Sequence, residues 1–382
     1  MAVTGRLTGV WLANGAGREY ASAVMLADLV PESFFTSLEQ GRAWVLWLLS
    51  AGAIALLVVG ADRVVTAAVR LAAVLGMSKV IVGATVVSLG TTSPEAFTSV
   101  TAAFQGKPGL ALGNGIGSII CDTALIFGLC CCIRRLPLDR LVLNRHGWIQ
   151  LGAGALLTGV ILAGAVAAGG IGEVEIPRWV GFSFVALLVG YMYLSVRWAR
   201  GDPRLIPAEV RIEQVKAPAA PARSQLAASL WNLLVLAVGL ALVILGSSVL
   251  VGSASALCHK YGVPQSILAA TLVAFGTSLP ELVTAIASLI KGHADLLVGN
   301  IVGADILNVL FVVGASAAAT PLRVEREVFY LLLPVMMLVL VLLRLFIFVS
   351  RDRFHRWHGA VLLAIYVAYC ILVVRFGVGA GH

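Results

Sequence analysis

Two glutamates, Glu95 and Glu281, each lie near the middle of a long apolar stretch of the sequence. A carboxylate at the centre of a bilayer costs roughly 2.5–3.5 kcal/mol on insertion scales, so such a residue usually faces a polar cavity and serves ions or protons. A single buried glutamate could instead fix helix packing through hydrogen bonds. Two glutamates in matching surroundings favour an ion or proton site.

The residues before each glutamate can supply further oxygen ligands. A proline directly precedes both glutamates, and because proline has no N–H, the carbonyl four residues before it loses its helical partner. Residues three and four positions before a glutamate share its helix face. Each half therefore combines a carboxylate with hydroxyls and a loosened carbonyl: Thr91, Thr92 and the carbonyl of Gly90 in the first half, and Thr277, Ser278 and the carbonyl of Gly276 in the second.

This predicted ligand set consists of hard oxygen atoms. Ca²⁺ binds about six to eight oxygens, including carboxylates that offset its charge. Softer metals prefer thiolate and imidazole ligands, and none of the six histidines lies in the middle of an apolar stretch. Asp305 adds a third carboxylate within such a stretch, and Asn308 follows about one helical turn later. The pattern predicts a binding site for small cations.

The two glutamates belong to an internal repeat. Residues 83–128 align without a gap with residues 269–314 at a constant offset of 186, and 15 of the 46 positions are identical. The identical positions include Gly, Pro, Glu and Asn in one register, and unrelated apolar helices do not share these residues by chance. The sequence therefore predicts an internal duplication.

The composition requires a membrane around these repeats. The chain is 60% hydrophobic and 12% charged over 382 residues, and its apolar runs are long and continuous, which indicates helices. The spans expected are 43–62, 79–104, 109–133, 147–168, 178–197, 226–251, 263–290, 294–318, 327–349 and 357–376. The predicted fold is an all-α membrane protein with ten transmembrane helices.

The spacing of the repeats predicts how the helices are organised. The two copies occupy spans 2–3 and 7–8, and an odd number of crossings between them reverses their orientation. We therefore expect two inverted five-helix halves, at 43–198 and 226–376. An extracytoplasmic tail (1–42) precedes the first half, and a proline-containing cytoplasmic linker (199–225) joins the two.

The basic residues predict which ends of the helices face the cytoplasm. When successive loops are assigned alternately to two sides, 17 Lys and Arg residues fall on one side and nine on the other. The richer side is cytoplasmic by the positive-inside rule, which places both termini outside. This distribution explains the net charge of +8 without a nucleic-acid partner.

The paired G-T-[ST]-x-P-E and G-N-x-x-G segments resemble the alpha repeats of the calcium/cation antiporter superfamily, and within it those of the sodium/calcium exchangers. The resemblance implies exchange of Ca²⁺ for Na⁺ by alternating access, in the plasma membrane and with no resident cofactor. It also implies central ion sites lined by Glu95 and Glu281, with help from the residues Thr91, Thr92, Thr277, Ser278 and Asp305 and from backbone oxygens near Ser88 and Ala274.

One position departs from the pattern of the family. The first repeat of the family usually has Asn or Asp where this chain has Ile119, the counterpart of Asp305. A carboxylate follows three residues later at Asp122, where the second repeat has Asn308. Asp122 lies about 60° around a helix from Ile119, so both direct ion binding and a separate polar contact stay open.

Other functions share parts of this pattern. Exchange of Ca²⁺ for H⁺ would use the same scaffold, because a glutamate removed from water can carry a proton. A passive cation channel usually places identical groups around an oligomeric axis, whereas here the carboxylates pair within one chain. A membrane enzyme would need a nucleophile beside a base, and no such pair is visible.

Overall fold

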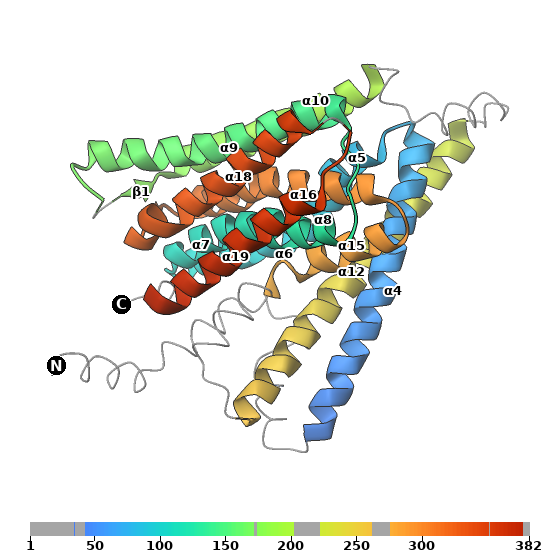
Figure 1. Ribbon diagram of the computed structural model, residues 1–382, viewed down its shortest axis with the longest axis horizontal. Coiled ribbons are helices and arrows are strands. Elements are labelled where there is room, and N and C mark those ends of the chain that lie inside the picture. The colour runs from blue at the N-terminus through green and yellow to red at the C-terminus, as the bar shows by residue number, and fades with distance from the viewer. Residues whose placement is uncertain are drawn as a thin grey trace.

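The computed structural model describes Phe34 and residues 43–171, 174–201, 222–261, 276–350 and 352–376. Most of the predicted tail and linker, the residues before Gly276 in the seventh span, and Ala274 therefore lie outside the described residues. Within them the chain is almost entirely helical (Figure 1).

Nine helical segments in the described ranges are long and apolar enough to cross a membrane. They are α4 (Ala43–Leu75), α5–η1–α6 (Lys79–Val82, Gly83–Val87, Ser88–Phe104), α7–η2–α8 (Pro108–Ile120, Cys121–Phe127, Gly128–Ile133), α9 (Arg140–Ala167), α10 (Arg178–Gly201), α12 (Ala222–Lys260), α16–η5–α17 (Ala294–Leu307, Asn308–Val313, Gly314–Ala319), η6–α18 (Val328–Leu332, Leu333–Val349) and α19 (Arg356–Phe376). The shorter α15 (Leu279–Ile290) is the described part of the remaining predicted span.

The largest difference from the predicted spans is the length of the first helix. It was expected to end at residue 62, but α4 continues to Leu75. Nothing between these positions breaks a helix, and the chain turns only at Gly76, whose φ of 65° suits glycine. Charged residues at 62–70 therefore extend the helix beyond the apolar run that the sequence marks.

The helix of the second repeat begins later than expected. In the first repeat, helix continues through Pro94, whereas in the second the chain turns at Thr277 and Ser278 and α15 begins at Leu279. Pro280 then occupies the first turn, where its missing N–H costs no hydrogen bond. The two repeats thus handle the same proline differently.

The helices α4 and α12 form an antiparallel pair at one side of the molecule (Figure 1). Ser50 and Ser253 share a hydrogen bond of 2.8 Å, and further along the pair the two backbones meet at Gly60 and Gly239. A Cβ on Gly60 would lie 2.9 Å from the carbonyl oxygen of Gly239. Small residues allow this approach, as they do between membrane helices generally.

The two repeat hairpins point in opposite directions. Their tips turn at Gly106 and Gly292, which have φ values of 74° and 79° and differ by the repeat offset. The second tip lies at the start of the second span, because Lys79 Nζ is 3.4 Å from His293 Nδ1. The first tip follows the far end of that 26-residue span. The inverted arrangement predicted from the sequence is therefore confirmed.

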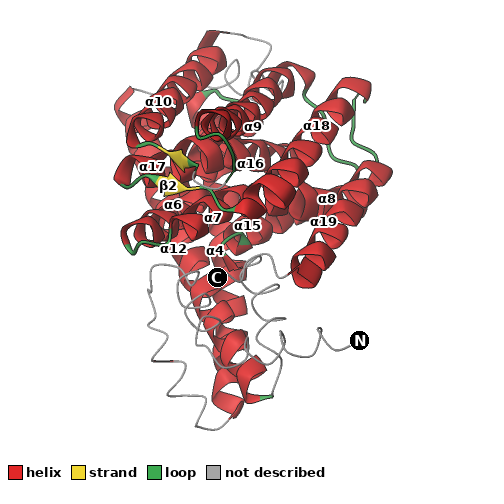
Figure 2. Ribbon diagram, turned by 90° about the vertical axis from the view of Figure 1, so that its left-hand side faces the viewer, coloured by secondary structure: helices red, strands yellow, loops and turns green. Residues whose placement is uncertain are grey.

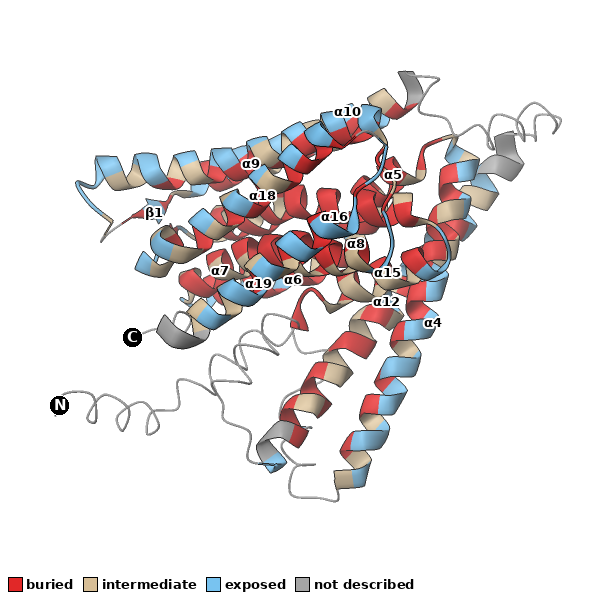
Figure 3. Ribbon diagram, in the orientation of Figure 1, coloured by how far each residue is buried: buried red, intermediate tan, exposed pale blue. Residues whose placement is uncertain are grey.

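The span that begins with α16 is the most enclosed of the molecule. It is 94% buried, compared with 28% for α4. Figures 2 and 3 show α16 inside the bundle, with exposed faces on the outer helices. It packs against η1, α6, α9 and α15.

Glycines allow α16 to approach its neighbours. A Cβ on Gly299 would collide with the carbonyl oxygen of Val80, and one on Gly303 would lie 2.5 Å from the Cα of Ala84. This confirms the close packing expected at these two glycines. Gly113 and Gly117, their counterparts in the first repeat, meet nothing within 4 Å among the described residues.

Three wider, π-type helical turns interrupt the spans that carry the repeats. The turns η2 (Cys121–Phe127) and η5 (Asn308–Val313) occupy matching positions of the two repeats, and η1 (Gly83–Val87) leads into α6. Such turns occur frequently at functional sites because they leave backbone groups less regularly bonded.

Contacts between loops agree with the alternate assignment of loops to two sides. Strand β1 (Glu175–Ile176) pairs with β2 (Leu322–Arg323), which joins the loops after the fourth and eighth spans. Pro137 bridges to Arg353, which joins the loops after the third and ninth. Lys291 forms an ion pair of 2.6 Å with Asp62 on the same assigned side.

Candidate ion-binding site

The structure brings the two repeat glutamates together. Glu95 lies on α6 and Glu281 on α15, each is only 1% exposed, and their carboxyl groups interact directly. Thr92 Oγ1 of the first repeat donates a hydrogen bond of 3.4 Å to Glu281 Oε1 of the second. The two halves of the chain therefore meet at these side chains.

Two aspartates complete an acidic cluster around the glutamates. Asp122 lies on η2 and Asp305 at the end of α16, and both are buried. Asp122 is close enough to Glu281, to Asp305 and to Glu95 for their charges to repel each other. The structure thus places Asp122 among the other acidic side chains, so that each repeat contributes two carboxylates.

Part of each carboxylate lacks a partner within the described residues. Buried oxygens without a hydrogen bond occur on all four acids: Glu95 Oε2, Asp122 Oδ1, Glu281 Oε2 and Asp305 Oδ1. No Lys, Arg or His side chain of the described ranges forms an ion pair or hydrogen bond with these groups. Buried charges are normally paired or bound to metal ions, so this arrangement calls for cations or protons.

The predicted hydroxyl residues lie beside the cluster. Ser88, Thr91 and Thr92 are fully buried on α6, and Thr91 Oγ1 donates to the carbonyl oxygen of Ser88 at 3.3 Å and also interacts with Glu281. Thr277 and Ser278 are buried in the turn before α15. The threonines of the first repeat therefore contact the glutamate of the second repeat, which a same-helix argument did not predict.

Two amides in the cluster belong to the repeat motifs. Asn308 Nδ2 donates to Asp122 Oδ2 at 3.4 Å. Asn114 Nδ2 donates to the backbone oxygen of Glu95 at 3.4 Å and to Ser99 Oγ at 2.9 Å. Asn114 thereby ties α7 to the helix that carries Glu95.

Two residues that the sequence argument missed hold Asp305. Gln150 Nε2 on α9 donates to Asp305 Oδ2 at 2.5 Å, and the hydroxyl of Thr123 donates to the same oxygen. Gln150 is a buried amide inside a predicted span, which is a signal that could have identified it. Thr123 gives no such signal beyond its place next to Asp122.

A second polar network supports the backbone next to the cluster. His146 Nδ1 on α9 lies 3.0 Å from the hydroxyl of Tyr191 on α10, and this hydroxyl donates to the carbonyl oxygen of Ala84 at 3.1 Å. Ala84 belongs to η1, directly before the helix of Glu95. The outer helices α9 and α10 are therefore connected to the turn that leads into the site.

The cluster offers oxygen ligands only. No group of three His, Cys, Asp or Glu side chains in the described part of the chain is arranged to hold a metal ion by itself. A cation between these carboxylates would therefore also take hydroxyl, amide or backbone oxygens, as Ca²⁺ does in sites of six to eight ligands.

Comparison with known proteins gives matches to both halves of the chain. The sequence model of the family described as sodium/calcium exchanger protein matches residues 45–197 and 231–375. The chain is 30% identical over 323 residues to the putative antiporter CaxA of Alkalimonas amylolytica, and this match covers 83% of the chain and 95% of the relative.

Further similarities are found to a curated exchanger and to a solved structure. The chain is 26% identical over 336 residues to the sodium/calcium exchanger MaX1 of Methanosarcina acetivorans, covering 83% of this chain and 95% of that protein. The structure of the sodium-calcium exchanger NCX_Mj soaked with 2.5 mM Na⁺ and 1 mM Sr²⁺ superposes with a TM-score of 0.68 at 25% identity, covering 85% of this chain and 96% of that one.

Proposed function

Because this chain belongs to the sodium/calcium exchanger protein family, we propose that it exchanges Ca²⁺ for Na⁺ across the membrane by alternating access. The chain is a multi-pass membrane protein of an antiporter family, and the proposal concerns its ions and their site. The two halves would move relative to each other around the acidic cluster, as in other transporters built from inverted repeats.

The observation that carries the proposal is the set of four buried carboxylates with unpartnered oxygens. Together they carry more negative charge than a buried site tolerates without cations. One Ca²⁺ or several Na⁺ ions would offset this charge. An empty, negatively charged site would resist exposure to the other side, which would couple the two ion flows.

We assign ligand roles according to the geometry of the cluster. Glu95, Glu281, Asp122 and Asp305 would bind the ions directly. The hydroxyls and the amide beside them, together with backbone oxygens, would complete the coordination: Ser88, Thr91, Thr92, Thr277, Ser278, Asn308 and the carbonyl of Ala274. No resident cofactor is needed. The protein would work in the plasma membrane with both termini outside the cytoplasm.

A second candidate is exchange of Ca²⁺ for H⁺ at the same cluster. Four neighbouring acids that lack basic partners could be neutralised by protons as well as by Na⁺. This candidate differs from the first only in the coupling ion.

Transport by the purified, reconstituted protein tests both candidates. Radioactive Ca²⁺ uptake is measured in proteoliposomes with an outward Na⁺ gradient, with a pH gradient, or with neither. We expect uptake that saturates with Ca²⁺ and requires internal Na⁺. Uptake that ignores Na⁺ and follows the pH gradient would assign the protein to Ca²⁺/H⁺ exchange, and unsaturable uptake without any gradient would indicate a channel.

Variants locate the site in the same assay. We expect Glu95→Gln and Glu281→Gln each to abolish Ca²⁺ uptake while the protein still purifies as a folded species. Glu327→Gln makes the same chemical change in a loop after α17 and should transport as the wild type does. Full activity of either site variant would refute the ligand assignment.

A further inference from the structure

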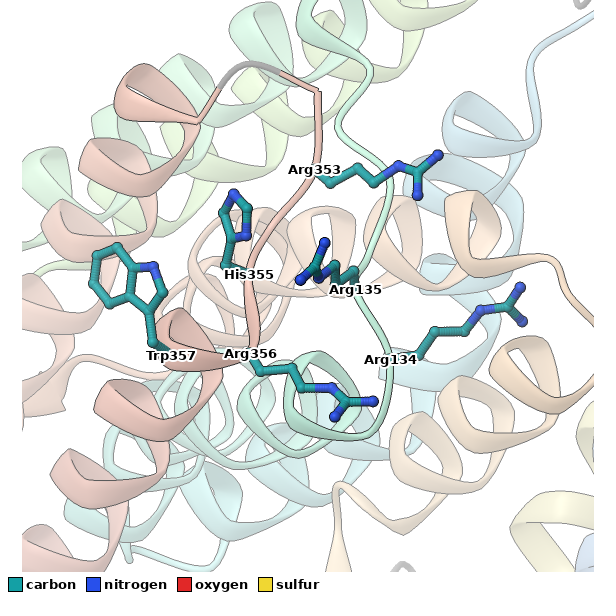
Figure 4. A pocket seen from close by; sticks show the side chains of 6 residues that line it. All are labelled: Arg134, Arg135, Arg353, His355, Arg356 and Trp357. Carbon is teal, nitrogen blue, oxygen red and sulfur yellow. The ribbon is translucent and has the colours of Figure 1, made fainter.

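A basic pocket lies at one end of the bundle, away from the acidic cluster. It has a volume of about 600 Å³ and lies between the loop that joins α8 to α9 and the loop that joins α18 to α19 (Figure 4). We call it the arginine pocket, and its lining consists of Arg134, Arg135, Arg353, His355, Arg356 and Trp357. The exchange of cations gives no role to this group of positive charges.

The two loops that carry the arginines form a fixed frame. Leu138 N donates to the carbonyl oxygen of Asp352 at 3.0 Å, and Phe354 N donates to that of Leu136 at 2.9 Å. The side chains of Leu136 and Phe354 are fully buried beneath the loops. Cys131 Sγ donates to the carbonyl oxygen of His355 at 3.2 Å. The arginines therefore extend from an ordered double loop on the end of the bundle.

The positive charges of the pocket are not neutralised by the described part of the chain. None of its four arginines forms an ion pair with a described carboxylate. Asp139 is engaged as the cap of α9, since its Oδ1 accepts hydrogen bonds from Leu141 N and Val142 N. Arg356 Nη2 donates to the carbonyl oxygen of Ile133 at 3.3 Å, which uses only one of its five N–H groups.

The side chains converge on a space of limited size. Figure 4 shows Arg135 and Arg356 between the two loops. Guanidinium groups present planar pairs of N–H donors that match the oxygens of a phosphate group. Four of them around one pocket repel each other unless an anion joins them, and a phosphate offers several acceptor oxygens at once.

The position of the pocket corresponds to the membrane surface. Ile133 ends one span and Arg356 begins another, so the arginines lie where lipid headgroups are found. Trp357 is 55% exposed in the first turn of α19, as expected for an aromatic residue at the interface. Both loops belong to the side that the basic residues assign to the cytoplasm, where anionic lipids attract such clusters.

We propose that the arginine pocket binds a phosphate group at the membrane surface, held mainly by Arg135 and Arg356. The phosphodiester of an anionic phospholipid and a soluble phosphate share this chemistry. The neighbouring span ends favour the lipid. Bound there, the anion would join the loops after the third and ninth spans.

Lipid binding by the full-length protein tests the proposal without measuring transport. Purified protein in detergent is titrated with phosphatidylglycerol, with phosphatidylcholine or with inorganic phosphate, and the melting temperature and the retained lipid phosphorus are measured. We expect phosphatidylglycerol to be retained and to raise the melting temperature. The double variant Arg135→Gln/Arg356→Gln should bind it at least about tenfold more weakly, because each arginine loses hydrogen bonds to a charged group.

Two matched variants make the result specific. Arg63→Gln/Arg70→Gln removes the same charge from exposed arginines of α4 on the same assigned side, and should bind the lipid as the wild type does. Arg135→Lys/Arg356→Lys keeps the charge but loses the planar donors, and should bind with intermediate affinity. Equal losses in the α4 variant and the pocket variant would overturn the proposal. A response to inorganic phosphate that depends on Arg135 and Arg356, with none to the lipid, would support the phosphate site and assign it to a soluble anion.

Discussion

The side-chain amide of Asn308 donates a hydrogen bond of 3.4 Å to the carboxylate of Asp122, and these two residues occupy the same position in the two repeats. One repeat thus supplies a negative charge where the other supplies a neutral amide. The charge is balanced one helical turn earlier, where the second repeat has Asp305 and the first has the buried Ile119. The two halves contribute two acids each, although the acids are not placed symmetrically.

This pairing predicts the effect of moving the charge across the pseudo-symmetry. Asp122→Asn removes one carboxylate from the cluster, and we expect the Ca²⁺ concentration for half-maximal uptake to rise at least about tenfold, equivalent to about 1.4 kcal/mol. The double variant Asp122→Asn/Asn308→Asp restores the charge at the partner position and should recover most of the affinity. Uptake curves in Na⁺-loaded proteoliposomes give both values, and an unchanged curve for Asp122→Asn would exclude this residue from the site.

Gln150 provides a second prediction, because it donates one of the two hydrogen bonds to Asp305 Oδ2. Gln150→Leu leaves this buried carboxylate with fewer partners, and a hydrogen bond to a charged group contributes about 1.5–3 kcal/mol. We expect the ion-free variant to melt at a lower temperature than the wild type. Bound Ca²⁺ would replace the missing donor, so the rise in melting temperature on adding Ca²⁺ should be larger than in the wild type.

The control for this measurement is Gln105→Leu, which changes an exposed glutamine at the tip of the first hairpin. It should alter neither the melting temperature nor its response to Ca²⁺. A smaller response to Ca²⁺ in Gln150→Leu than in the wild type would instead mean that Gln150 holds Asp305 in its ion-binding position.

The sequence predicted the parts of this structure that depend on composition and repetition. The helical spans follow from apolar length, and the inversion follows from the odd number of spans between two copies of one motif. Glu95, Glu281 and Asp305 could be identified because acids inside apolar stretches are costly. These signals are all visible in the linear order of residues.

Contacts between distant spans were not predictable in the same way. The hydrogen bonds from Thr92 to Glu281 and from Gln150 to Asp305 join residues 189 and 155 positions apart. Helix periodicity relates only residues of one helix, so it grouped Thr92 with Glu95. The arginine pocket was hidden for the same reason, because its two loops are adjacent only in the folded chain.

The close approach of α16 to the second span predicts a large effect of one methyl group. A Cβ on Gly299 would collide with the backbone oxygen of Val80, which has no freedom to move as a side chain would. We expect Gly299→Ala to destabilise the protein by about 1–3 kcal/mol, as overpacking typically does. Thermal unfolding in detergent measures the change.

Gly152→Ala is the matched control for Gly299→Ala. Gly152 is an exposed residue inside α9, and a Cβ there meets nothing within 4 Å. Because alanine favours helix over glycine, this variant should be as stable as the wild type or slightly more stable. A Gly299→Ala protein that melts like Gly152→Ala would mean that the two helices can separate without cost.

Glu325 predicts a pH dependence that is separate from the ion site. This loop residue is exposed overall, but its carboxylate contacts the backbone of Gly109 at the start of α7. Partial burial, and then repulsion by Glu327, raises the pKa of Glu325 above its ordinary value of 4.5. The folded protein therefore binds this proton more tightly than the unfolded chain does. The stabilising contribution is full below pH 4.5 and is lost as the pH rises through the raised pKa.

Glu325→Gln keeps a neutral side chain at every pH, so it should remove this loss. We expect the variant to match the wild type near pH 4 and to melt at a higher temperature near neutral pH, where the wild-type carboxylate is ionised against its neighbours. Melting curves from pH 4 to 8 are compared with those of Asp352→Asn, an exposed acid in a loop on the opposite side, which should follow the wild type. If the difference between Glu325→Gln and the wild type stays constant across this range, ionisation of Glu325 does not affect the stability of the fold.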